Sequence, residues 1–171
     1  MLEKLLSYLK KLDSRTLNND SSVYRLILSH FFLWPVNKSL QFLQAASNYL
    51  ENLNQSARDQ RFFRILHFIE SIDNTKDWMQ HWPKKMFHTV ELYRRYDNYS
   101  TRSLLRLIRN VYIHFYDDCN GLHFNNSMQQ YWQFIFKNFP TLLPEVWFCL
   151  LKDGQVVESL KPFYSYKDTS T

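Results

Sequence analysis

Turn-forming residues are scarce in this chain, which has only 2 glycines and 5 prolines among 171 residues. A sheet of many strands needs frequent glycine-containing turns, so the scarcity argues against an all-β fold and favours helices. The chain is nevertheless expected to fold, because 45% of its residues are hydrophobic and 18% are aromatic. Its length fits one domain with a sizeable core.

Cysteine is equally sparse, with Cys119 and Cys149 alone. Two thiols make no disulfide framework, and no Cys-x-x-Cys pair or metal-like histidine spacing occurs. We therefore expect a reducing, cytoplasmic setting, no metal and no cofactor. The stretch MLEKLLSYLKKLDSR lacks the apolar run of a signal peptide, and no segment is long enough to span a bilayer.

Hydrophobic periodicity predicts an all-α fold, a compact single helical domain of about eight helices. The expected helices cover residues 2–12, 22–31, 35–53, 56–72, 83–93, 101–118, 128–139 and 141–151. Ser100 or Thr101 is the expected N-cap of the helix at 101–118, and Ser127 that of the helix at 128–139. The last dozen residues, after a turn at Asp153–Gly154, are expected to form a tail.

Positive charge is concentrated in one part of the sequence. The net charge is +5, and the window from Tyr93 to Asn110 alone holds five arginines against the single acid Asp97. These arginines are Arg94, Arg95, Arg102, Arg106 and Arg109. Such a local field attracts polyanions, most commonly nucleic acid, although a solvated basic face remains an equal alternative at this point.

The helix at 101–118 carries Arg102, Arg106, Asn110 and His114 at four-residue spacing, so all four are expected on one face. This set suits RNA cleavage without a metal, which needs a base for the 2′-hydroxyl, an acid for the leaving 5′-oxygen and donors to the phosphate. Histidine is a suitable acid near neutral pH, and arginine and asparagine are good fixed donors. Tyr96 lies just upstream and is placed to fold back over the face.

These residues alone do not decide the function. A histidine on an amphipathic helix is more often a surface residue than a catalyst, and a tyrosine near a helix start usually packs. His30, Trp34 and Trp78 are interpreted as packing residues, and Cys149 as a buried apolar residue. From composition and spacing, the chain is a helical domain with a candidate nucleic-acid-binding face.

The stretch SLLRLIRNVYIHFYDD resembles the core motif of the kinase-extension nuclease (KEN) domain family. That family includes the inositol-requiring kinase/endoribonuclease of the unfolded-protein response and RNase L. Its pattern of Asp-Leu-Leu-basic, then Arg-Asn and a histidine four residues later, is filled here from Leu104 to His114. Ser103 replaces the family's aspartate, a change expected to alter helix capping or a loop contact.

Further stretches agree in the same order. HFFLWPVNKSLQFLQAASNYLE resembles the family's junction after the kinase lobe, with Phe31 and Leu33 departing from the pattern. Asp77–Trp78 matches an upstream Asp-Trp, and YWQFIFKNFPTLLPEVW resembles the closing helices. Tyr96 lies 14 residues before Asn110, the spacing of the family's catalytic tyrosine.

The resemblance implies a division of the chain. Residues 30–166 correspond to the KEN-type ribonuclease domain, residues 167–171 to a tail, and residues 1–29 to a remnant of the end of a kinase C-lobe. The chain has no Gly-rich loop, β3 lysine, HRD or DFG sequence, so it is not expected to be a kinase. A kinase or pseudokinase region in a longer parent protein is an expected partner. If that parent is a membrane protein, the domain would lie on the cytosolic face of the endoplasmic reticulum.

The resemblance also implies residue roles. His114 is the expected general acid, Tyr96 the base or phosphate-positioning hydroxyl, and Asn110 and Arg109 hold the scissile phosphate. The other four arginines of the basic window, Arg94, Arg95, Arg102 and Arg106, are expected RNA contacts that an RNA phosphate neutralises.

The implied function is a metal-independent endoribonuclease, active as a homodimer, that leaves 2′,3′-cyclic phosphate and 5′-hydroxyl ends. The alternatives are a catalytically silent KEN-like module that binds RNA or protein, and a helical scaffold unrelated to RNA.

Overall fold

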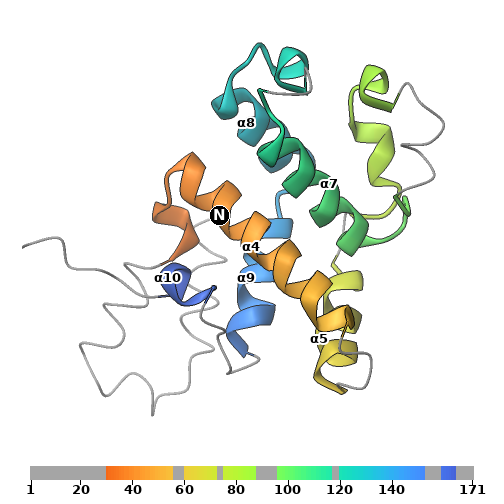
Figure 1. Ribbon diagram of the computed structural model, residues 1–171, viewed down its shortest axis with the longest axis vertical. Helices are drawn as coiled ribbons and strands as arrows, with labels where there is room; N and C mark the ends of the chain where they lie inside the picture. The colour runs from red at the N-terminus through yellow and green to blue at the C-terminus, as the bar shows by residue number, and fades with distance from the viewer. Residues whose placement is uncertain are drawn as a thin grey trace, which may run out of the picture.

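The computed structural model describes residues 30–55, 60–72, 75–87, 96–116, 120–152 and 159–164, and within them it is all-helical (Figure 1). The long helices are α4 (Val36–Gln55), α5 (Gln60–Glu70), α7 (Thr101–Ile113), α8 (Met128–Asn138) and α9 (Leu142–Lys152). The short elements are η1 (Phe31–Leu33), η2 (Trp78–His81), η3 (Lys84–Phe87), η4 (Asn120–Phe124) and α10 (Lys161–Tyr164). The expected all-α fold is confirmed. Residues 1–29, expected to be the kinase-lobe remnant, lie outside the described residues, and with them the expected helix at 2–12 and nearly all of that at 22–31. Residues 88–93 of the helix expected at 83–93 lie outside them as well.

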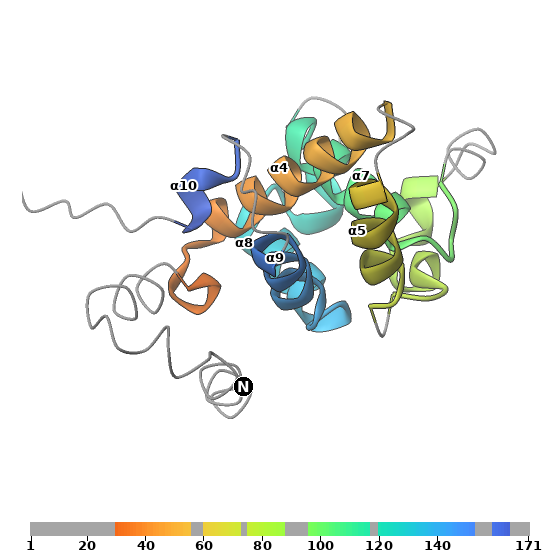
Figure 2. The same ribbon diagram turned by 90° about the horizontal axis from the view of Figure 1, so that it is seen from below.

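Helix α4 is the central element and packs against α7, α8, α5 and α9 (Figures 1 and 2). Pro35 precedes it, and Leu40, Leu43, Ala46 and Leu50 recur at helical spacing with no exposed surface. Asn48 and Glu51 of α4 both contact arginine side chains of α7. This placement puts α4 beside α7, the basic helix.

The core is dominated by large aromatic side chains. The largest fully buried side chains include Trp78, Trp147, Tyr131, Phe42, Phe115 and Phe139. Their burial explains the high aromatic content, since each ring removes a large apolar area from water.

In the part of the chain that the structure describes, no single helix is long and apolar enough to cross a membrane. Only the pair α8 and α9, bent by 82°, reaches the needed length and apolar composition when the two helices are taken together.

Two sequence expectations about boundaries were wrong. Residues 160–164 are not part of a tail, because Leu160 and Phe163 are buried and the Tyr164 hydroxyl donates to the Trp147 carbonyl at 3.0 Å. The helix expected to continue to residue 118 ends at Ile113, and His114 is its C-cap. The interruption is explained by Phe115, whose ring turns into the core beside Phe124 and Tyr131.

His30, the first described residue, is a buried packing residue, as expected. Its ring lies between Phe31, Phe32 and Trp147, and it is 4% exposed. The Nδ1 atom accepts a hydrogen bond from the Phe32 N–H at 3.3 Å, which caps η1. A protonated ring has no acceptor at that atom, so this hydrogen bond forms only with neutral His30.

Acidification is therefore expected to destabilise the fold through His30. Burial lowers the pKa of His30 from 6.5 to about 4, so between these values the unfolded chain binds a proton that the folded chain does not. The stability that neutral His30 contributes to the free energy of unfolding is fully present above pH 6.5, and it falls as the pH drops toward 4. Urea unfolding across this range measures it.

His30→Asn is the matched variant, because its side-chain oxygen still accepts from Phe32 but does not titrate. The stability difference between wild type and variant should shrink as the pH falls. A difference that stays constant with pH would contradict the assigned protonation state of His30.

Candidate active site

Helix α7 carries most of the candidate residues, and local sequence explains its position. Ser100 is the N-cap, and its side chain accepts from the Ser103 N–H at 3.1 Å. Leu104, Leu105 and Ile108 have no exposed surface and fix the inward face. The opposite face therefore presents the arginines and Asn110 at partly buried positions beside α4.

A carboxylate from another helix holds the first turn of α7. Glu70, at the end of α5, accepts hydrogen bonds from the Ser100 hydroxyl at 2.8 Å and the Thr101 N–H at 2.7 Å. It also accepts from the Arg102 N–H at 3.3 Å. An anion at a helix N-terminus satisfies free N–H groups and complements the helix dipole. Glu70 therefore fixes the end of the helix that adjoins the Tyr96 loop.

The loop at residues 96–100 is clamped by the Asp-Trp pair. The Trp78 indole N–H donates to the Asp97 carbonyl at 3.1 Å and to the Ser100 carbonyl at 3.2 Å. Asn98 joins the same clamp, accepting from the Met79 N–H at 2.8 Å and donating to the Asp77 carboxylate. Trp78 is thus more than the packing residue expected, because it fixes the loop that carries Tyr96.

Ser103 contributes a second loop contact. Its hydroxyl accepts from the Asp97 N–H at 3.2 Å, while its own N–H donates to the Ser100 cap. The residue that departs from the family pattern therefore makes the loop contact, and capping by Ser100 is retained.

Three of the four predicted catalytic residues form one hydrogen-bonded chain. The Arg109 guanidinium donates to the Asn110 side-chain oxygen from Nε at 3.1 Å and from Nη2 at 2.9 Å. The Asn110 amide then donates to the Tyr96 hydroxyl at 2.8 Å. Because arginine has no acceptor, the Asn110 oxygen must face Arg109 and its NH₂ must face Tyr96. The amide orientation is therefore fixed. The Tyr96 oxygen accepts from Asn110, so its O–H group can donate a hydrogen bond to another group.

The Tyr96 ring is held on several sides. The Arg106 guanidinium lies 4.9 Å from its centroid, and the Trp78 ring packs edge-on at 6.3 Å. Tyr131 lies nearby in α8 and donates to the Ile108 carbonyl at 2.9 Å. Burial first, and Tyr96 second, raise the pKa of Tyr131, so it stays a neutral donor. Tyr96 is consequently 9% exposed, with its hydroxyl directed at Asn110.

Arg102 corrects one expectation about the basic face. We expected no carboxylate to neutralise it, but Glu51 of α4 binds Arg102 through two contacts, at 3.1 and 3.2 Å. The pair is partly buried and bidentate, the stronger geometry for such ions. Arg102 therefore joins α7 to α4, whereas Arg106 and Arg109 surround Tyr96 and Asn110.

His114 lies one turn after Asn110, and its backbone N–H donates to the Asn110 carbonyl at 3.0 Å. Its side chain is exposed. The next residue, Phe115, is anchored by the Gly121 N–H, which donates to the Phe115 carbonyl at 2.8 Å. A Cβ at Gly121 would lie 2.7 Å from that same oxygen, so only glycine fits there. The turn that carries His114 is thus fixed by η4.

Arg94, Arg95 and Cys119 lie outside the described residues. Within the described ranges no group of three histidine, cysteine, aspartate or glutamate residues lies close enough to hold a metal ion.

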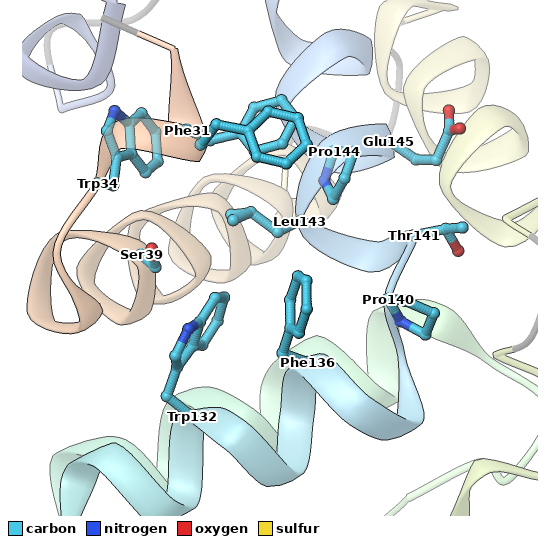
Figure 3. A pocket seen from close by; sticks show the side chains of 11 residues that line it. Phe31, Trp34, Ser39, Trp132, Phe136, Pro140, Thr141, Leu143, Pro144 and Glu145 are labelled. Carbon is cyan, nitrogen blue, oxygen red and sulfur yellow. The ribbon is translucent and has the colours of Figure 1, made fainter. Parts of the chain in front are cut away.

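A pocket of about 450 Å³ lies elsewhere, between η1, α4, α8 and α9 (Figure 3). Trp132 and Phe136 project into it from α8, opposite Phe31 and Trp34. Glu145 is the only ionisable residue among those that line it. None of the predicted catalytic residues reaches this pocket, so its apolar walls are separate from the candidate active site.

The family described as Ribonuclease 2-5A matches residues 39–164, most of the chain. The chain belongs to this family. The match contains most of α4, the Tyr96 loop, α7 and the turn that carries His114. Membership therefore covers every part of the candidate active site, and it confirms the resemblance to KEN domains.

Two relatives of this Ribonuclease 2-5A member carry kinase names. The chain is 34% identical over 90 residues to the probable serine/threonine-protein kinase ireA of Dictyostelium discoideum, covering 53% of the chain and 9% of the relative. It is 29% identical over 128 residues to the serine/threonine-protein kinase/endoribonuclease IRE1 of Oryza sativa subsp. japonica, covering 71% and 13%. The aligned part of this chain spans about a tenth of the length of each relative.

No pattern in the sequence pointed to Glu70, Glu51 or Asn48 as parts of the candidate active site. Asn48 of α4 accepts from Arg109 at 3.1 Å and thereby extends the chain of hydrogen bonds. These residues stand 30 to 61 positions from their partners, so helical periodicity cannot bring them together. A search for polar residues along α4 and α5 would have included these three residues.

Proposed function

We propose that this chain is a metal-independent endoribonuclease that cleaves RNA by attack of the substrate's own 2′-hydroxyl. The observation that carries the proposal is the chain of hydrogen bonds Arg109–Asn110–Tyr96, with His114 one turn further along. The Oryza sativa relative, whose name includes endoribonuclease, supports the same reading.

In the proposed reaction the 2′-oxygen bonds to phosphorus and the bond from phosphorus to the 5′-oxygen breaks. Tyr96 either takes the 2′-hydroxyl proton, or it positions the phosphate by donating a hydrogen bond to a phosphate oxygen while the 2′-hydroxyl proton passes to water. Arg109 and Asn110 steady the charge of the phosphorane, as fixed donors do at other developing oxyanions. His114 gives a proton to the leaving 5′-oxygen, which yields 2′,3′-cyclic phosphate and 5′-hydroxyl ends.

The charge around this site favours a polyanion. Arg106 and Arg109 lie on the α7 face beside Asn110, and we propose that both contact RNA backbone together with Arg94 and Arg95. Arg102 is assigned mainly to its ion pair with Glu51 and is the weakest of the proposed RNA contacts. We further propose that activity depends on a homodimer, which a kinase-type region supplied with the domain would drive.

The test is incubation of the chain with RNA in EDTA, followed by analysis of the product ends. We expect cyclic phosphate and 5′-hydroxyl ends, no cleavage where the cleaved nucleotide carries 2′-deoxyribose, and specific activity that rises with protein concentration. Activity that requires added Mg²⁺, or cleavage of the deoxy substrate, would refute the chemistry. Salt-dependent RNA binding without any cleavage would instead establish the silent module, and a flat specific activity with a monomer throughout would refute dimer activation.

A further inference from the structure

We infer that Tyr116 is a stacking platform for the base on the 3′ side of the cleaved bond. The inference rests on the proposed function and assigns a role to a residue outside the hydrogen-bonded chain. Tyr116 is 70% exposed, although it follows directly after the deeply buried Phe115. An aromatic ring left this open beside an RNA-cleaving group is suited to stack on a nucleobase.

The position of Tyr116 relative to His114 indicates which base it takes. His114 and Tyr116 flank Phe115, whose ring points into the core, and both are exposed. Their Cα atoms are at most about 7 Å apart, because two trans peptide units reach no further. The oxygen that His114 protonates belongs to the nucleoside 3′ of the cleaved bond. The base of that nucleoside therefore lies nearest to Tyr116.

The ring is held in place before substrate arrives. Phe115 packs edge-on against Tyr116, with the ring centroids 5.0 Å apart and the planes at 85°. Phe115 is in turn fixed by Gly121, which donates to its carbonyl. A platform anchored in this way loses little side-chain entropy on binding, so more of the stacking energy is kept. The arginines on α7 would hold the backbone while the base stacks, the combination common in single-strand binding.

A second strongly exposed tyrosine among the described residues provides a matched control. Tyr99 is 69% exposed and lies just before α7, whose 13 residues extend about 20 Å. It therefore has the same chemistry and exposure as Tyr116 but lies at the end of the helix away from His114.

The experiment uses an oligonucleotide of 2′-deoxynucleotides with a single ribonucleotide, so that cleavage occurs only at the bond after it. A second copy lacks the base of the nucleotide on the 3′ side of that bond. Wild type is expected to cut the first copy about 5- to 100-fold faster, the usual range for loss of one stacked base. Tyr116→Ala should lose this discrimination, whereas Tyr116→Phe and Tyr99→Ala should keep it. Tyr116→Leu retains an apolar contact with Phe115 but no flat ring, and it should also lose discrimination.

Equal cleavage of the two copies by wild type would overturn the inference, and so would full discrimination by a folded Tyr116→Leu variant. An all-RNA parent oligonucleotide separates this failure from that of the proposed function. If the parent is cut while discrimination is absent, the stacking role alone is wrong. If the parent is not cut at any protein concentration, the proposed function fails as well.

Discussion

Replacing His114 with alanine is expected to reduce RNA cleavage by roughly 10²- to 10⁴-fold, the usual contribution of a positioned acid or base. The loss should not come from unfolding, because His114 lies after the last residue of α7 and its side chain is exposed. RNA binding should be retained, since Arg106 and Arg109 remain on the α7 face. Single-turnover cleavage and equilibrium RNA binding, measured side by side, test both parts.

His67→Ala is the matched control, because His67 is also an exposed histidine but lies in α5. It should cleave at the wild-type rate. Wild-type cleavage should fall at alkaline pH, because a general acid must hold a proton to give to the leaving 5′-oxygen. A folded His114→Ala protein that binds RNA and cuts near the wild-type rate would disprove the role. His114→Gln, a neutral side chain of similar size, gives the same test should alanine prevent folding.

The parts of the site predicted from sequence are those that depend on local spacing. The buried stripe Leu104, Leu105 and Ile108, and the Ser100 cap, follow from residues within two turns of one another. Ser127 was found as the cap of α8 for the same reason. Local order also allowed Tyr96 to be placed over the α7 face, although its partners were not predicted.

The parts that sequence missed depend on distant residues. The basic window looked unneutralised because Glu51, which binds the Arg102 side chain, comes from another helix. Glu70, which accepts from the first turn of α7, also comes from another helix, and no count over neighbouring residues includes either carboxylate. Likewise, the end of α7 is set by the burial of Phe115 against Tyr131 of α8, so the helical periodicity of the sequence overshot it. In each case tertiary packing determined what local propensity left open.

The connection between Asn110 and Tyr96 predicts that their contributions to catalysis are not independent. Asn110→Ala and Tyr96→Phe are each expected to slow cleavage by about 10²-fold, the usual cost of removing one fixed donor. Because the Asn110 amide donates directly to the Tyr96 hydroxyl at 2.8 Å, each variant also breaks the partner's contact. The double variant should therefore be much less than about 10⁴-fold slower than wild type, as found when residues act as one unit.

Asn110→Asp separates the two ends of the Asn110 side chain. It keeps acceptors for Arg109 but lacks the NH₂ that holds Tyr96, and its charge repels the phosphate. It should therefore be at least as slow as Asn110→Ala while Arg109 stays in place. Asn48→Ala, which removes only the outer contact of Arg109, should stay within a few-fold of wild type. The test of coupling compares single-turnover rates of wild type, Asn110→Ala, Tyr96→Phe and the double variant. Unfolding midpoints check that all four are folded. Strictly multiplicative losses would show that Asn110 and Tyr96 contact the substrate separately. Wild-type rates in both single variants would show that this face of α7 is only a solvated surface.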